Sequence, residues 1–175
     1  MPNTYDLIST QTLVSSTSTF TVNLPTGYTD VQLRMSLRSN RSGQTADSIL
    51  FYVNGDTAGA NYNRIEFYDE SGTLGSELIF GGSMGAQFGG IPAVNANAML
   101  FANSIVDLPQ YTSTNRKVIT LYNSFQITGG PTRYIWHTNL NWTGTAPLTT
   151  VSIVSGSASS LVAGSSISIY GIKKA

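Results

Sequence analysis

Alternation of apolar and polar residues at every second position is the feature that most constrains how this chain can fold. Val31, Leu33, Met35 and Leu37 alternate with polar residues, which is the pattern of a β-strand with one buried face. No segment shows the 3.6-residue periodicity of an amphipathic helix. The sequence therefore predicts an all-β protein.

Nine or ten short segments have strand character and are separated by turn-forming residues. The clearest turn is Asn54-Gly55, because these residues readily adopt the positive φ angles of a tight hairpin turn. The segments lie near residues 20–24, 31–38, 49–53, 62–68, 77–80, 99–108, 117–125, 134–142, 148–154 and 166–172. Short strands with uneven spacing and no repeated unit indicate a sandwich or barrel rather than a propeller.

The length of 175 residues suits one domain, and no change of composition marks a linker. We therefore expect residues 1–175 to form a single jelly-roll-like antiparallel β-sandwich. Within it, residues 1–15 are a candidate N-terminal arm. Residues 81–97 are rich in Gly and Ala and are expected to form a long loop.

The low content of charged residues limits the classes of partner. Nine basic residues balance nine acidic ones, so the chain lacks the positive excess that binding to nucleic acid or to an anionic membrane requires. Charged residues make up 10% of the chain, against ~25% in an average soluble protein. A surface so weakly charged does little to repel other proteins. The N-terminus shows no secretory signal, so we expect the protein to fold where it is made.

The residue types that build metal and cofactor sites are scarce. The chain has no cysteine and one histidine, which excludes disulfides and a conventional zinc site. Oxygen ligands for calcium remain open at Asp56, Asp69 and Glu70, although no regular calcium-binding loop is present. No phosphate-binding or dinucleotide-binding motif occurs, so no cofactor is predicted.

One segment matches a hydrolase motif in letters alone. Residues 81–85 read G-G-S-M-G, and Asp107 and His137 follow in the order of an α/β-hydrolase triad. That motif requires a helix directly after the serine, whereas Gly89, Gly90 and Pro92 disfavour one. We therefore predict that the protein is not an enzyme.

Three aromatic residues share one face of a predicted strand. Tyr134, Trp136 and Trp142 are spaced as the core residues of a sandwich would be. The same spacing suits rings buried at a subunit contact or an exposed surface on which sugar rings stack. The sequence leaves these three interpretations open.

Several blocks resemble a known family over most of the chain. They are Tyr5-Asp6-Leu7-Ile8, Ala46-Asp47-Ser48 with Asn54-Gly55-Asp56-Thr57 and Asn61-Tyr62, Leu108-Pro109-Gln110-Tyr111-Thr112-Ser113-Thr114, and Ala163-Gly164-Ser165 with Ile169-Tyr170-Gly171-Ile172-Lys173-Lys174-Ala175. They resemble small virion structural proteins of tailed bacteriophages, including those of cyanobacterial hosts. The chain departs from the family in its longer 81–97 segment and in Gln110.

The resemblance implies a capsid decoration, or cement, protein of jelly-roll-like fold. Such a protein would lie on the capsid exterior after assembly in the host cytoplasm. It would bridge neighbouring subunits of the major capsid protein and would itself be a homotrimer. No nucleic acid, membrane or cofactor is implied.

Two groups of apolar residues are candidates for the contacts with partners. One is at the N-terminus and the other is in the Gly-rich segment: Tyr5, Leu7, Ile8, Met84, Phe88 and Ile91. The alternative function is a tail-fibre or adhesin domain that recognises host surface glycan through Trp136 and Trp142.

Overall fold

The computed structural model describes residues 4–82, 86–127 and 133–173. These residues form twelve β-strands and one short 3₁₀ helix, η1 (Gly59–Asn61). The strands are β1 (Thr4–Thr12), β2 (Thr19–Asn23), β3 (Asp30–Leu37), β4 (Ala46–Val53), β5 (Tyr62–Glu70), β6 (Thr73–Phe80), β7 (Gln87–Pro92), β8 (Ala102–Leu108), β9 (Lys117–Gln126), β10 (Arg133–Trp142), β11 (Thr150–Ser155) and β12 (Ser166–Lys173).

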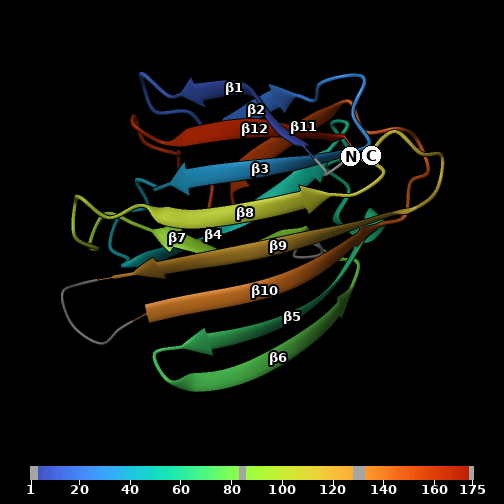
Figure 1. Ribbon diagram of the computed structural model, residues 1–175. Helices are drawn as coiled ribbons and strands as arrows, with labels where there is room; N and C mark the ends of the chain where they lie inside the picture. Colours follow the sequence, from blue (N-terminus) through green and yellow to red (C-terminus); the bar gives the residue numbers. More distant parts are fainter. Residues whose placement is uncertain (1–3, 83–85, 128–132, 174–175) are drawn as a thin grey trace.

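The strands form two antiparallel sheets that pack face to face (Figure 1). The large sheet has eight strands in the order β1-β12-β3-β8-β9-β10-β5-β6. The small sheet has four, in the order β2-β11-β4-β7. The predicted all-β sandwich is confirmed.

The chain passes repeatedly from one sheet to the other. Strands β2, β3, β4 and β5 belong alternately to the small and the large sheet, so each connection crosses an end of the sandwich. Connections of this kind are found in Greek-key and jelly-roll sandwiches. The jelly-roll form itself remains a prediction.

Buried residues of both sheets meet in one hydrophobic cluster. Leu33 and Leu37 of β3 point into it, as their alternation predicts, and Phe51 and Ile153 reach it from the small sheet. The T-shaped contact of Phe51 with Phe88, whose ring centroids are 5.6 Å apart, lies in this core.

Two strands occupy segments for which the sequence predicts an arm and a loop. Residues 1–15 are not a free arm where they are described, because β1 pairs along its length with β12 at the edge of the large sheet. The predicted loop at residues 81–97 contains β7, which pairs with β4. Gly89 and Gly90 lie directly on the aromatic core, so their lack of side chains lets this strand approach it.

The large sheet is wider than the small one, so its last strands extend beyond the cover that the small sheet gives (Figure 1). We call the side of the large sheet that faces the small sheet the inner face, and the opposite side the outer face. Strand β6, at the rim, has no buried residue.

Candidate interface on the outer face of the large sheet

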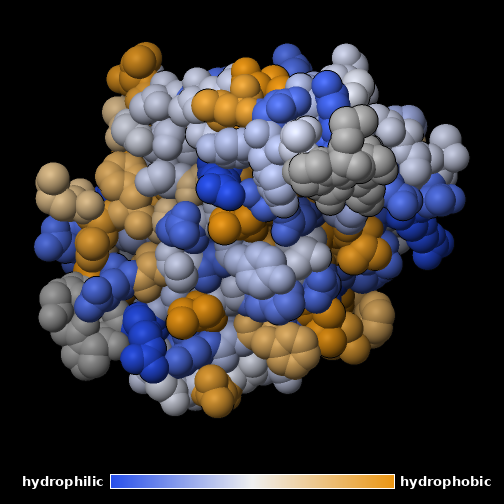
Figure 2. Space-filling model, in the orientation of Figure 1, coloured by the Kyte–Doolittle hydropathy of each residue, from blue (hydrophilic) through white to orange (hydrophobic). Residues whose placement is uncertain are grey.

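Exposed apolar side chains gather on the outer face of strands β9, β10, β5 and β6. We call this group the apolar face; it consists of Ile65, Phe67, Leu74, Leu78, Phe80, Val118, Tyr122 and Ile135. Their exposed fractions range from 39% for Ile65 to 82% for Leu74, so they are surface groups and not core residues that are partly visible. Figure 2 shows orange side chains over this lower part of the large sheet.

Strand register places members of the apolar face beside one another. Across neighbouring strands, Tyr122 lies opposite His137, which in turn lies opposite Phe67. The Tyr122 and His137 rings stack with centroids 4.5 Å apart and planes 15° apart. On the next pair of strands, Ile65 lies opposite Leu78. These contacts make the group a laterally connected surface.

Charge is almost missing from this surface. On the outer face of the described residues of these four strands, the charged side chains are Asp69 and Arg133, and they pair with each other at 3.3 Å. Covering this surface therefore removes few ionic groups from water, which keeps the desolvation cost of a contact low.

The inner face explains why apolar residues point outward here. Arg64 is fully buried, and its Nη2 atom lies 2.8 Å from Glu77 Oε2 and 3.4 Å from Glu66 Oε1. Thr138 donates a hydrogen bond to Glu66 at 3.3 Å. Because these polar residues occupy the inner side of β5, the alternation of the strand sends Ile65 and Phe67 to the outer face.

Burial raises the pKa of the Glu66 carboxyl group. The neighbouring Arg64 guanidinium lowers it and the Glu77 carboxylate raises it, and the net direction is upward. A carboxylate beside an arginine usually has a lowered pKa, so desolvation outweighs the ion pair at this position.

The predicted N-terminal contact residues are accessible. Tyr5, Leu7 and Ile8 of β1 are 56%, 59% and 39% exposed. Tyr5 lies opposite Ile172 and Leu7 opposite Tyr170, at the edge of the large sheet that is farthest from β6. They form a second apolar group, separate from the apolar face.

Polar side chains lie between these two apolar groups, on β3 and β8. Gln32 donates a hydrogen bond to Asp107 at 2.9 Å, and Arg34 donates one to Gln32 at 3.0 Å. The Arg34 guanidinium also lies over the Tyr170 ring. The outer face is therefore apolar towards both edges and polar between them.

The prediction for the Gly-rich segment is wrong for two of its residues. Phe88 and Ile91 are completely buried, because this segment forms strand β7, which is buried along almost its whole length, instead of an open loop. They are not available to a partner. Met84 lies outside the described residues.

The two tryptophans proposed for glycan stacking are core residues. Trp136 is 7% exposed, and its indole packs beneath Gly89 and Gly90. Trp142 is 6% exposed, packs against Gly144, and donates its indole N–H to Asp56 at 2.8 Å. Both side chains are buried, so neither offers an exposed ring on which a sugar could stack, and the prediction of a glycan contact is wrong for both residues.

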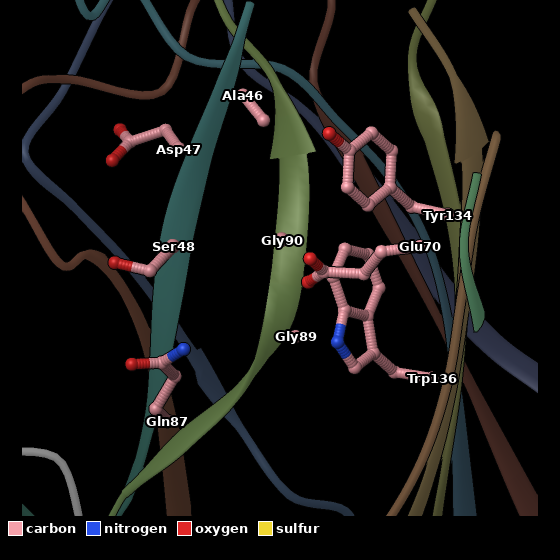
Figure 3. A pocket seen from close by; sticks show the side chains of 9 residues that line it. All are labelled: Ala46, Asp47, Ser48, Glu70, Gln87, Gly89, Gly90, Tyr134 and Trp136. Atoms are coloured by element: carbon pink, nitrogen blue, oxygen red, sulfur yellow. The ribbon is translucent and has the colours of Figure 1, made fainter. Parts of the chain in front are cut away.

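A small cavity of about 260 Å³ lies beside Trp136, where the rim of the small sheet faces β5 and β10 (Figure 3). Tyr134, Trp136 and Glu70 point into it, whereas the Asp47 side chain points away. Asp47 instead accepts hydrogen bonds from Ser155 and Ser159 and lies 3.5 Å from Arg41. The cavity is smaller than the ~300–1,000 Å³ of usual ligand sites.

The turn at Asn54-Gly55-Asp56 is held in place by several hydrogen bonds to Asp56. Asp56 accepts hydrogen bonds from Trp142, from Asn61 at 2.8 Å and from the backbone N–H of Ala58 at 3.1 Å. Burial alone would raise the pKa of Asp56, but these three hydrogen bonds together lower it. The Tyr62 hydroxyl ties the same turn to β4 by donating to the Asp56 carbonyl oxygen and accepting from Val53 N–H.

The structure does not bring together the candidate residues for catalysis or for metal binding that it describes. Ser83 lies outside the described residues, and β9 lies between the strands that carry Asp107 and His137. Among the described residues, no group of three or more His, Cys, Asp or Glu side chains could hold a metal ion. In the same part of the chain, no helix is long and apolar enough to cross a membrane.

Comparisons with known proteins add little to this description. No protein-family model matches the chain, and no curated protein matches it. One solved structure, the CBM2 module of the evolved Dit of Lactobacillus casei BL23 phage J-1, aligns with 90% of this chain and 69% of its own. The identity is 9% and the TM-score 0.20, which does not establish a shared fold.

Proposed function

We propose that this chain is a virion structural protein of the capsid decoration type. It binds the outside of an assembled capsid through the apolar face and bridges neighbouring subunits of the major capsid protein. The sequence blocks that resemble phage virion proteins support this role. The observation that carries the proposal is the apolar face, because a contiguous exposed group of this kind marks an interaction site on a soluble protein.

The proposed contact stabilises a capsid by mass action. A ligand that binds only the assembled state stabilises it by RT ln(1 + [L]/Kd). Burial of apolar surface contributes roughly 25 cal/mol per Å², and a standard interface covers ~800 Å² on each partner. Lost translational and rotational freedom offsets much of that contribution, and the near-absence of charge on the apolar face keeps the additional cost of desolvating polar groups small.

Substitutions on the apolar face test the proposal with purified capsids. Phe67→Ser and Ile135→Ser change exposed residues at the centre of this surface, so they should leave the fold intact and weaken co-sedimentation with capsids at least about tenfold. The matched control is Val14→Ser, which changes a more exposed apolar residue outside the apolar face and should bind like the wild type. Equal binding by all four proteins would contradict the proposal.

Copy number distinguishes decoration from the adhesin alternative. Densitometry of purified virions against the major capsid protein should give hundreds of copies per particle for a decoration protein. A handful of copies would instead indicate a tail component and would refute the capsid role.

A further inference from the structure

Strand β6 leaves a long, unprotected edge on the large sheet. It runs from Thr73 to Phe80 without a proline or a lysine, and among the residues that the structure describes it pairs only with β5 (Figure 1). Its pairing with β5 has no β-bulge. Edges of this kind pair readily with another strand, because their N–H and C=O groups lack partners on one side.

The other three edges of the sandwich carry protective features. Strand β1 has an irregularity between Leu7 and Ser9, and β7 has one in its pairing with β4 and ends at Pro92. Strand β2 has five residues. Bulges, proline and short length are the usual devices that prevent pairing between sheet edges. Strand β6 has none of these three devices, and its one charged residue, Glu77, is paired with Arg64 at 2.8 Å. Of the four edges, β6 is therefore the one most open to pairing.

The β5–β6 turn determines which residues of β6 offer hydrogen bonds to a partner. Ser71 and Gly72 form a two-residue turn with φ angles of 57° and 93°, so the closing pair Glu70 and Thr73 exchange hydrogen bonds. At the other end, the Gly81 N–H donates to the Tyr62 carbonyl oxygen. This bond is expected if every second pair, counted from Glu70 and Thr73, exchanges hydrogen bonds. The backbone groups facing the open edge then belong to Leu74, Ser76, Leu78 and Phe80.

We propose that β6 pairs antiparallel with β6 of a second copy of this chain, with Ser76 opposite Ser76 on the two-fold axis. In this register Leu74 of each copy lies opposite Leu78 of the other, on the same outer face. The backbone groups of these residues all face the junction, so every pair can exchange hydrogen bonds. The two large sheets then become one.

Charge disfavours one of the two neighbouring registers. Moving the axis to Glu77 would place Glu77 directly opposite Glu77, and like charges in that position destabilise an antiparallel pair. With Ser76 on the axis, Glu77 lies opposite Gly75 instead. A two-fold junction uses the same edge of both copies and so closes as a dimer.

This inference is independent of capsid binding, and it differs from the homotrimer that the sequence resemblance implies. Its first test is sedimentation velocity of the full chain over a range of concentrations. We expect a monomer–dimer equilibrium. A monomer at all concentrations, a trimer, or open-ended association would overturn the proposal.

A proline substitution locates the junction. Ser76→Pro removes an N–H that faces the open edge and not β5, so the β5–β6 pairing persists while the dimer weakens at least about tenfold. Ser76→Ala keeps the N–H and is the matched control, which should dimerise like the wild type. Circular dichroism and thermal melting verify that both variants fold. A folded Ser76→Pro variant that still forms the dimer would overturn the proposal.

Cysteine cross-linking tests the register, because the chain has no cysteine of its own. Opposite residues that exchange hydrogen bonds have Cα atoms ~5.5 Å apart, within the span of a disulfide. Ser76→Cys should therefore give a covalent dimer on mild oxidation. Thr73→Cys, which lies far from its counterpart in this register, should not. Equal cross-linking of both variants would refute the register.

Discussion

At the scale of single residues, two buried cations, Arg38 directly after β3 and Lys117 at the start of β9, are held by backbone carbonyl oxygens. Arg38 donates hydrogen bonds to the carbonyl oxygens of Ala93, Ala96 and Asn97, at 2.8, 3.1 and 2.7 Å. Lys117 donates to two carbonyl oxygens of the preceding loop. Burial lowers the pKa of both side chains. A single guanidinium thereby organises the loop that follows β7.

Removing the Arg38 guanidinium should strongly destabilise the fold. Arg38→Met keeps the aliphatic volume but leaves buried carbonyl oxygens without donors, and hydrogen bonds to charged groups contribute ~1.5–3 kcal/mol each. We expect the free energy of unfolding in urea to fall by roughly 3–5 kcal/mol. Arg34→Met on the exposed outer face is the matched control, and a loss as large there would contradict this account.

At the scale of elements, β7 combines buried apolar residues with glycines that lie close to the aromatic core. A Cβ atom at Gly89 would lie 3.1 Å from the Asn123 side chain and 3.3 Å from Trp136. Gly89 also has a φ angle of +92°, which strains any other residue. The absence of a Cβ atom at Gly89 therefore helps the strand to lie close to the aromatic core.

Substitution by alanine separates the effect of the positive φ angle from the effect of close packing around the new Cβ atom. Gly89→Ala adds a steric clash to the backbone strain, and we expect it to lower the free energy of unfolding by roughly 2–4 kcal/mol. Gly27→Ala has a similar φ angle of +82° but open space around the new Cβ, so it should cost only about 1 kcal/mol. Equal losses would mean that packing against Trp136 plays no part.

All ten segments predicted from alternation and turns are strands, because two-residue periodicity and residues such as Asn54-Gly55 are local signals. The other two strands, β1 and β7, are not marked by these local signals. Phe88 and Ile91 of β7 are separated by glycines whose role is a contact with β10. The exposed Tyr5 and Leu7 of β1 are fixed by pairing with β12, at the other end of the chain. Neither long-range contact can be predicted from the local sequence.

At the scale of the whole molecule, alternation predicts that every second residue of a strand is buried, but it does not predict which of the two sets of residues faces the core. In β5 the simple rule would bury Ile65 and Phe67, whereas the structure buries Arg64 and Glu66 between the sheets. The phase is decided by the partners Glu77 and Thr138 on neighbouring strands. For this reason the apolar face could not be predicted from the sequence. The N-terminal residues Tyr5, Leu7 and Ile8 are exposed, and their role as contact residues stays a prediction.

The buried carboxyl of Glu66 should make stability depend on pH. Its pKa is raised in the folded protein above the value of about 4.3 in the unfolded chain. Between these two values the folded state binds more protons than the unfolded state, so stability falls as the pH rises through this window and levels off above it. Glu66→Gln keeps an acceptor for Thr138 and leaves Arg64 paired with Glu77, but it cannot titrate.

Urea unfolding of the wild type and Glu66→Gln from pH 4 to pH 8 measures the contribution of Glu66 to the pH dependence of the free energy of unfolding. The difference in the free energy of unfolding should grow in favour of the variant as the pH rises, and should then become constant once Glu66 is ionised in the folded protein as well. Parallel profiles would show that the Arg64 ion pair fully compensates the burial of Glu66. In that case the inward placement of Arg64 and Glu66 would carry no net electrostatic cost, and the outward position of Ile65 and Phe67 would follow from a buried network that is fully compensated.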